Sequence, residues 1–123
     1  MNLNNRVIAI AGVLAIIGGC ASVPPEPAPS PLSIAIQSGK IAEECFTLAE
    51  GERIDYQFRS TAAVDFNLHT HRGNDIVMPV DVRATRVQSG TYASPRREDY
   101  CMMWTNSAAI PAHISGEWRR MRR

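Results

Sequence analysis

Two histidines near the middle of the chain have the spacing of a metal-binding pair. His69 and His71 are two residues apart, so on a β-strand they project from the same face. With Phe66 and Leu68 facing the core, both imidazoles are expected to face outward, where Cu(II), Zn or Ni would suit them. Further ligands, including thioether sulfur for Cu(I), could come from Asp65, Asp75, His113, Met78, Met102 and Met103. A polar surface strand that leads into a turn, without metal, is the simpler interpretation of the same pattern and the one that we favour.

A third group with possible chemistry, the thiol of Cys20, follows a segment with the three parts of an export signal. Arg6 supplies a positive charge, residues 7–17 form an apolar run, and the small residues Gly18 and Gly19 precede the cysteine. As a helix the run would span only about 16 Å, too short for a hydrocarbon core of about 30 Å. It is therefore not expected to be a permanent membrane span. An ordinary secretory signal that happens to contain a cysteine is the alternative.

The string Ile17-Gly18-Gly19-Cys20 resembles the lipobox of bacterial lipoproteins. The resemblance implies that the Cys20 thiol is diacylglycerylated and that residues 1–19 are removed as a signal peptide. It also implies that the new N-terminal amine is acylated, for example with palmitate. Two or three acyl chains anchor a protein firmly, whereas one chain holds it only marginally. Enteric lipoproteins that are retained in the inner membrane carry Asp directly after the lipidated cysteine. Here that position is Ala21, and the absence of Asp favours the periplasmic side of the outer membrane.

The two remaining cysteines, Cys45 and Cys101, are expected to form one disulfide. An even pair in an exported chain is most simply a bridge. Closing a loop of about 55 residues would stabilise the fold by roughly 4 kcal/mol in the chain-entropy model. A reactive or metal-binding thiol pair is the alternative, although the two cysteines lack the Cys-x-x-Cys spacing.

Two regions are expected after the signal peptide. Residues 21–31 contain five prolines, which favours an extended polyproline II spacer of about 30 Å. Together with Cys20 they form a linker over residues 20–31, although a proline motif that binds a partner is the alternative. From residue 32 to 123, apolar and polar residues alternate in short segments such as Ile54–Phe58 and Val64–Leu68. Such alternation, with turn signals about every 8–12 residues, predicts an all-β domain, a small antiparallel β-sandwich.

The apolar run Met102-Met103-Trp104 predicts a central strand that is buried on both faces. In this interpretation the indole of Trp104 packs against the disulfide. A methionine-rich binding surface is the alternative.

The order of features in the domain resembles a GOLD-type β-sandwich, the domain of Golgi-traffic cargo receptors. The resemblance rests on these segments: Cys45-Phe46, the Glu50-Gly51 turn, Arg53–Arg59, Val64–Gly73, Tyr100–Asn106 and Ile110–Trp118. It implies a disulfide at the two cysteines and an architecture associated with binding rather than catalysis. The chain is expected to differ from that family in its lipobox and in lacking a following coiled coil and membrane span.

The charge distribution limits the possible partners. The formal net charge is +1. Arg6 is the only charged side chain in residues 1–19, so the chain from Cys20 would have balanced charge. Nucleic acid is therefore not expected as a partner. The C-terminus is locally basic and could bind lipopolysaccharide phosphates or an acidic envelope protein. The arginines concerned are Arg119, Arg120, Arg122 and Arg123. A frayed, solvated tail is the alternative.

Catalysis is not expected from these motifs. The chain has no Gly-x-Ser-x-Gly elbow, and the adjacent carboxylates of Glu43 and Glu44 would point to opposite faces of a strand. We therefore expect a membrane-anchored envelope lipoprotein that is not an enzyme, with a β-sandwich that binds or assembles with a partner and needs no cofactor. The alternative is a periplasmic copper-binding protein that uses His69 and His71.

Overall fold

Six antiparallel strands make up the fold, and a computed structural model describes residues 18–122 of the chain. The strands are β1 (Ser30–Ile36), β2 (Ile41–Leu48), β3 (Arg53–Arg72), β4 (Asp75–Ala93), β5 (Glu98–Thr105) and β6 (Ala112–Met121). This part of the chain contains no helix, and accordingly none that could cross a membrane. The prediction of an all-β domain is confirmed. The expected signal peptide lies almost wholly outside the described residues.

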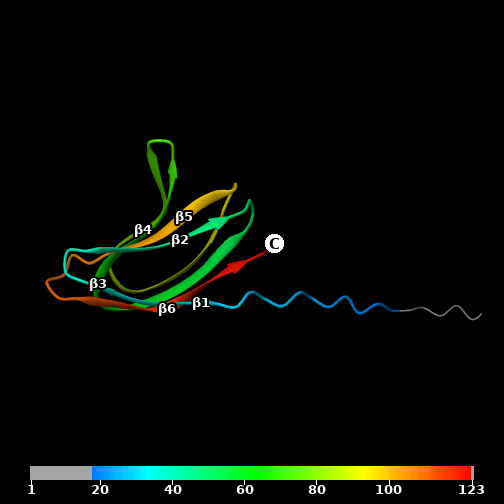
Figure 1. The fold of residues 1–123 in the computed structure, drawn as a ribbon, viewed down its shortest axis with the longest axis horizontal. Helices are drawn as coiled ribbons and strands as arrows, with labels where there is room; N and C mark the ends of the chain where they lie inside the picture. Colours follow the sequence, from blue (N-terminus) through cyan, green and yellow to red (C-terminus); the bar gives the residue numbers. More distant parts are fainter. Residues whose placement is uncertain (1–17, 123) are drawn as a thin grey trace, which may run out of the picture.

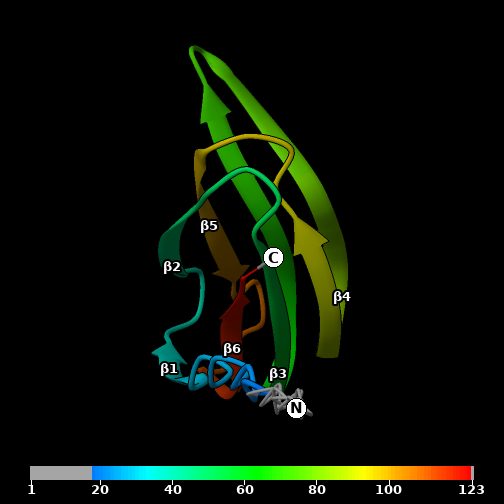
Figure 2. The same cartoon turned by 90° about the vertical axis from the view of Figure 1, so that its right-hand side faces the viewer.

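The long hairpin of β3 and β4 organises the sheet. β4 pairs with β3 along one edge, while the other edge of β3 pairs first with β6 and then with β5. The strand order is β1-β6-β3-β5-β2, with β4 added beside β3. Because β3 bends between these two partners, the sheet curls and its two halves enclose one core (Figure 1). The second view shows β4 as the outer strand on one side (Figure 2).

The core lies between the β1–β6 half and the β2–β5 half of the curled sheet. Its largest fully buried side chains include Trp104, Tyr100 and Phe66. The rings of Phe58 and Trp104 lie 4.9 Å and 5.5 Å, centroid to centroid, from Phe66, within the range of favourable aromatic pairs. Aromatic residues from β3 and β5 therefore join the two halves.

β3 is longer than the sequence pattern predicted. The separate segments Ile54–Phe58 and Val64–Leu68 belong to one continuous strand. Ser60 and Ala62 continue the inward-facing positions between them, and Ala62 is fully buried. Their side chains are too small to give the apolar alternation from which strands are read. The register with β4 shifts between Arg59 and Val64, which is where a bulge can bend the strand.

The turn and the linker are simple in form. Gly73 occupies the first central position of the two-residue β3–β4 turn with φ of 63°, a conformation that glycine adopts without strain. Residues 18–29 have no regular secondary structure and lead away from β1 as an extended chain (Figure 1). Cys20 is exposed in this segment.

Candidate functional site

Two concave sites on the outer surface of the sheet are the candidate functional sites. The first, here called the histidine cup, has a volume of about 170 Å³. Its lining residues are Glu43, His69, His71, Ile76, Met78 and Met103. Strand pairing brings them together, because Met103 on β5 lies opposite Glu43 on β2 and His71 on β3 lies opposite Ile76 on β4. The sequence-predicted histidine pair therefore lies in a concave site formed by four strands.

The two imidazoles of the cup are close to each other. Their ring centroids are 5.2 Å apart and the rings are nearly perpendicular, at 79°. Both project away from the core, since Phe66 and Leu68 occupy the alternate, fully buried positions of β3. His71 is exposed, whereas His69 is only 5% exposed, because side chains from the neighbouring strands surround it.

A hydrogen bond fixes the orientation of the His69 ring. Its Nδ1 lies 2.8 Å from Oδ1 of Asn67, and an amide oxygen only accepts hydrogen bonds. Nδ1 therefore donates, and in the neutral ring the lone pair is on Nε2. This Nε2 atom lies 3.9 Å from Oε1 of Glu43, which is beyond hydrogen-bond distance. The geometry leaves the lone pair of Nε2 without a hydrogen bond, near the carboxylate of Glu43.

Most of the further predicted ligands lie outside the cup. The side chain of Met102 is in the core, and both carboxylate oxygens of Asp65 bind β4, one through Arg83 and one through the backbone of Ala84. The backbone of His113 donates to Thr61, eight residues before His69 on β3. Asp75 pairs with Arg72 at the β3–β4 turn. Of the further ligands that the sequence suggested, only Met78 and Met103 line the cup together with the two histidines.

Cys45 and Cys101 form the predicted disulfide beside the cup. They are direct partners across β2 and β5, with Cα atoms 4.1 Å apart, and Cys101 is also opposite His69. Both sulfur atoms lie within 4.8 Å of a carboxylate oxygen of Glu43. The expected contact between Trp104 and the bridge is wrong, because residues three apart on a strand face opposite sides and Trp104 lies in the core.

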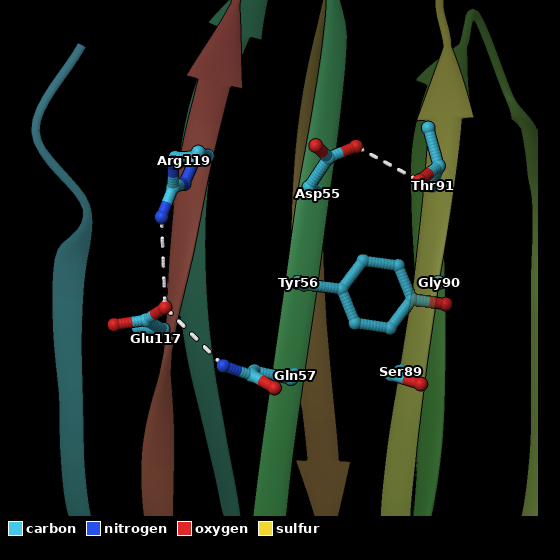
Figure 3. Close-up of a pocket in the computed structure, with 8 residues that line it drawn as sticks. All are labelled: Asp55, Tyr56, Gln57, Ser89, Gly90, Thr91, Glu117 and Arg119. Carbon is cyan, nitrogen blue, oxygen red and sulfur yellow. Dashed lines mark hydrogen bonds and ion pairs between the residues drawn. The ribbon is translucent and has the colours of Figure 1, made fainter. Parts of the chain in front are cut away.

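The second site, here called the polar trough, crosses β6, β3 and β4 on the other half of the sheet. It consists of two adjoining hollows of about 390 Å³ and 360 Å³ that share Gln57 and Ser89. The first hollow (Figure 3) is lined by Asp55, Tyr56, Gln57, Ser89, Gly90, Thr91, Glu117 and Arg119. The second adds Phe58, Arg59, Val87, Gln88, Ser115 and Gly116.

The polar side chains of the trough bind one another across the strands (Figure 3). The Thr91 hydroxyl donates to Asp55 Oδ1 at 2.8 Å, and Gln57 Nε2 donates to Glu117 Oε1 at 3.2 Å. The same Glu117 oxygen is 3.8 Å from Nη2 of Arg119. The trough therefore presents donors and acceptors of both charges in an ordered arrangement.

Two glycines allow close packing between the strands of the trough. A Cβ atom on Gly116 would lie 2.1 Å from the backbone oxygen of Gln57, and one on Gly90 would lie 2.6 Å from the Tyr56 hydroxyl. The Tyr56 ring reaches across to Gly90 (Figure 3). Burial raises the pKa of this tyrosine, so its hydroxyl stays neutral.

The basic C-terminal residues do not share one surface. β6 continues to Met121, so the adjacent Arg119 and Arg120 project from opposite faces of that strand. Nη1 of Arg119 also pairs with Glu26 of the linker at 3.3 Å, and Arg122 lines a hollow against residues 23–27. Arg123 lies outside the described residues. Binding of an anionic surface by these arginines stays a prediction.

An ion pair holds the strand ends near the cup. Nε and Nη2 of Arg72 donate to the two oxygens of Glu98 at 2.7 Å and 3.0 Å, and the Tyr100 hydroxyl donates to one of them at 2.8 Å. The hydrogen bond from Arg72, followed in size by that from Tyr100, lowers the pKa of Glu98 to about 2 against the opposing effect of desolvation. The carboxylate that fixes Arg72, next to His71, is therefore ionised at neutral pH.

Sequence reasoning missed Glu43 as part of the histidine cup and missed the whole polar trough. The position of Glu43 could have been predicted from the expected disulfide. If Cys45 and Cys101 are direct cross-strand partners, antiparallel pairing also places Glu43 opposite Met103. The trough gave no comparable signal, since it depends on which strands flank the first half of β3.

The fold places this chain among small antiparallel β-sandwiches. No protein family model and no curated protein matches the sequence. TmCBM61 in complex with β-1,4-galactotriose superposes with a TM-score of 0.54 at 12% identity, over 74% of this chain and 69% of that one. The Yersinia pseudotuberculosis-derived mitogen gives 0.54 at 13%, over 76% and 86%. PliG of Aeromonas hydrophila, a periplasmic inhibitor of g-type lysozyme, gives 0.50 at 12%, over 76% and 88%.

Proposed function

We propose that this chain is a lipid-anchored protein of the bacterial cell envelope whose β-sandwich is a non-catalytic binding module. The polar trough is its ligand-binding face. The observation that carries this proposal is the trough itself, an open hollow in which ordered polar side chains from three adjacent strands are exposed to a partner. Proteins of similar fold bind a galactotriose or inhibit a lysozyme, in line with a binding role.

The arrangement of the N-terminal segment supports a tether. Cys20 is exposed at one end of an extended proline-rich chain, and β1 begins at Ser30. An acylated Cys20 would hold the sandwich away from the bilayer with its faces accessible. The Cys45–Cys101 bridge suits an exported protein, because disulfides persist in oxidising compartments. We propose the periplasmic side of the outer membrane as its place.

The chemistry of the trough favours an envelope protein as the partner. Asp55 and Glu117 offset the charges of Arg59 and Arg119, so the surface has mixed charge rather than one sign. A surface of this kind suits the polar rim of a protein–protein contact, whereas phosphate-rich lipid would favour an excess of cations. The exposed Arg120 and Arg122 are left as candidates for contact with lipopolysaccharide.

Site-specific photo-crosslinking in living cells tests the binding face. A photoreactive amino acid replaces Ser89, which is exposed in the centre of the trough, or, as the matched control, Ser107, which is exposed in the β5–β6 connection. We expect illumination to give a discrete adduct with an envelope component from position 89 and none from position 107. Adducts from both positions alike, or from position 107 alone, would contradict a binding role for the trough, as would no adduct at all.

A further inference from the structure

We infer that the histidine cup is a copper(I) site whose ligands are the imidazoles of His69 and His71 and the thioethers of Met103 and Met78. The site is separate from the polar trough, since it lies on the β2–β5 half of the sheet and shares no residue with it. It is also independent of the proposed function of the trough, because a tethered binding module could carry the cup or lack it.

The orientation of His69 is the first argument. Metal-ligating histidines typically donate their second ring nitrogen to a fixed acceptor, which sets the tautomer and aims the ligating nitrogen. Here the Nδ1–H donates to Asn67, and Nε2 has no hydrogen-bond partner within the described residues. Nε2 is not among the side-chain atoms that are fully buried without a partner, so it is accessible from the hollow that His69 lines. A metal ion in the cup would therefore reach a nitrogen whose lone pair is free.

The second argument is the chemistry of the lining. Two histidines and two methionines line the same hollow, and this mixture of soft and intermediate ligands suits copper(I) better than hard cations. Met78 is 43% exposed and Ile76 is 55% exposed. These apolar side chains at the rim would shield a bound copper(I) ion from water and from oxidation.

Charge is the third argument. Glu43 places a carboxylate 3.9 Å from the free nitrogen of His69, where it would offset the positive charge of the ion. The nearby sulfurs of Cys45 and Cys101 are bonded to each other, so they are not available as thiolates. The site in the oxidised protein therefore depends on histidine and methionine alone, with Glu43 as the counter-charge.

Competition with a coloured copper(I) chelator tests the inference. The mature chain is purified in detergent with its disulfide intact and titrated without oxygen, with ascorbate present to hold the copper in the monovalent state. We expect transfer of one equivalent of copper from bicinchoninate to the wild-type protein. His71→Ala and Met103→Leu should each weaken the copper affinity by more than about tenfold. Loss of an outer-sphere partner alone typically weakens metal affinity by about tenfold or more, so loss of a direct ligand should have at least that effect.

His113→Ala is the matched control, because this third histidine is exposed on β6 and lies outside the cup. It should bind copper as the wild type does. Met103→Leu preserves volume and polarity, so a circular dichroism spectrum identical to the wild type would exclude misfolding as the cause of weaker binding. No copper uptake, uptake reduced equally by His113→Ala, or uptake indifferent to Met103→Leu would each overturn the inference.

Discussion

Replacement of both Cys45 and Cys101 by alanine is expected to lower the free energy of unfolding by about 4 kcal/mol. The bridge joins residues separated by 56 positions, and its loss frees a long loop in the denatured chain. The substitution should leave the core intact, because Cys45 is exposed and the bridge lies on the outer face of the sheet. Since small domains have only about 5–15 kcal/mol of stability, the effect would be large. Urea denaturation monitored by tryptophan fluorescence measures it.

Dithiothreitol provides the control for this prediction. It should reduce the stability of the wild type to that of the double variant and should leave the variant unchanged. If the wild type and the double variant unfolded at the same urea concentration, the bridge would not constrain the denatured chain in the way argued here.

Replacement of Asn106 by alanine is expected to cost about 2–4 kcal/mol, from three lost hydrogen bonds of about 1 kcal/mol each and the burial of their former partners. Asn106 is completely buried. Its Nδ2 donates to the carbonyl oxygens of Ile36 and Ile110 at 3.0 Å and 2.9 Å, and its Oδ1 accepts from the backbone of Ala108 at 3.0 Å. The side chain thereby joins the end of β1 to the β5–β6 connection.

Asn74→Ala is the matched control, because Asn74 is exposed in the β3–β4 turn. Its effect should stay within about 0.5 kcal/mol, as is usual for surface positions. Thermal unfolding of the two variants side by side measures the difference. Equal melting temperatures would show that the buried asparagine does not stabilise the junction of the two halves.

The sequence predicted the fold class because local patterning determines it. The inward-facing residues of β3 occupy every second position from Ile54 through Leu68. Such period-two alternation is a direct sign of a half-buried strand. The extent of β3 was not predicted, since the small residues Ser60 and Ala62 interrupt the apolar signal without interrupting the strand. The order of the strands in the sheet also escaped prediction, because pairing between distant segments leaves no local pattern.

The candidate sites were predictable only in part, for the same reason. The spacing of His69 and His71 placed them together on one face, and the disulfide followed from the number of cysteines in a chain that is expected to be exported. The burial of His69, by contrast, depends on Glu43 and Met103, which other strands bring beside it. His113 was a reasonable third ligand by residue type, but β6 pairs with the first half of β3, away from the cup. Residue type suggested the chemistry, whereas register decided which residues share a site.

Mass spectrometry of the mature protein from membranes tests the central claim most directly, because the proposed function begins with the modification of Cys20. We predict a chain that starts at Cys20 and carries acyl groups on that residue, and a Cys20→Ala variant that stays as unlabelled, uncut precursor. The Cys45→Ala/Cys101→Ala variant should be acylated as the wild type is. A mature wild-type chain without acyl groups, or one that begins at another residue, would contradict the account.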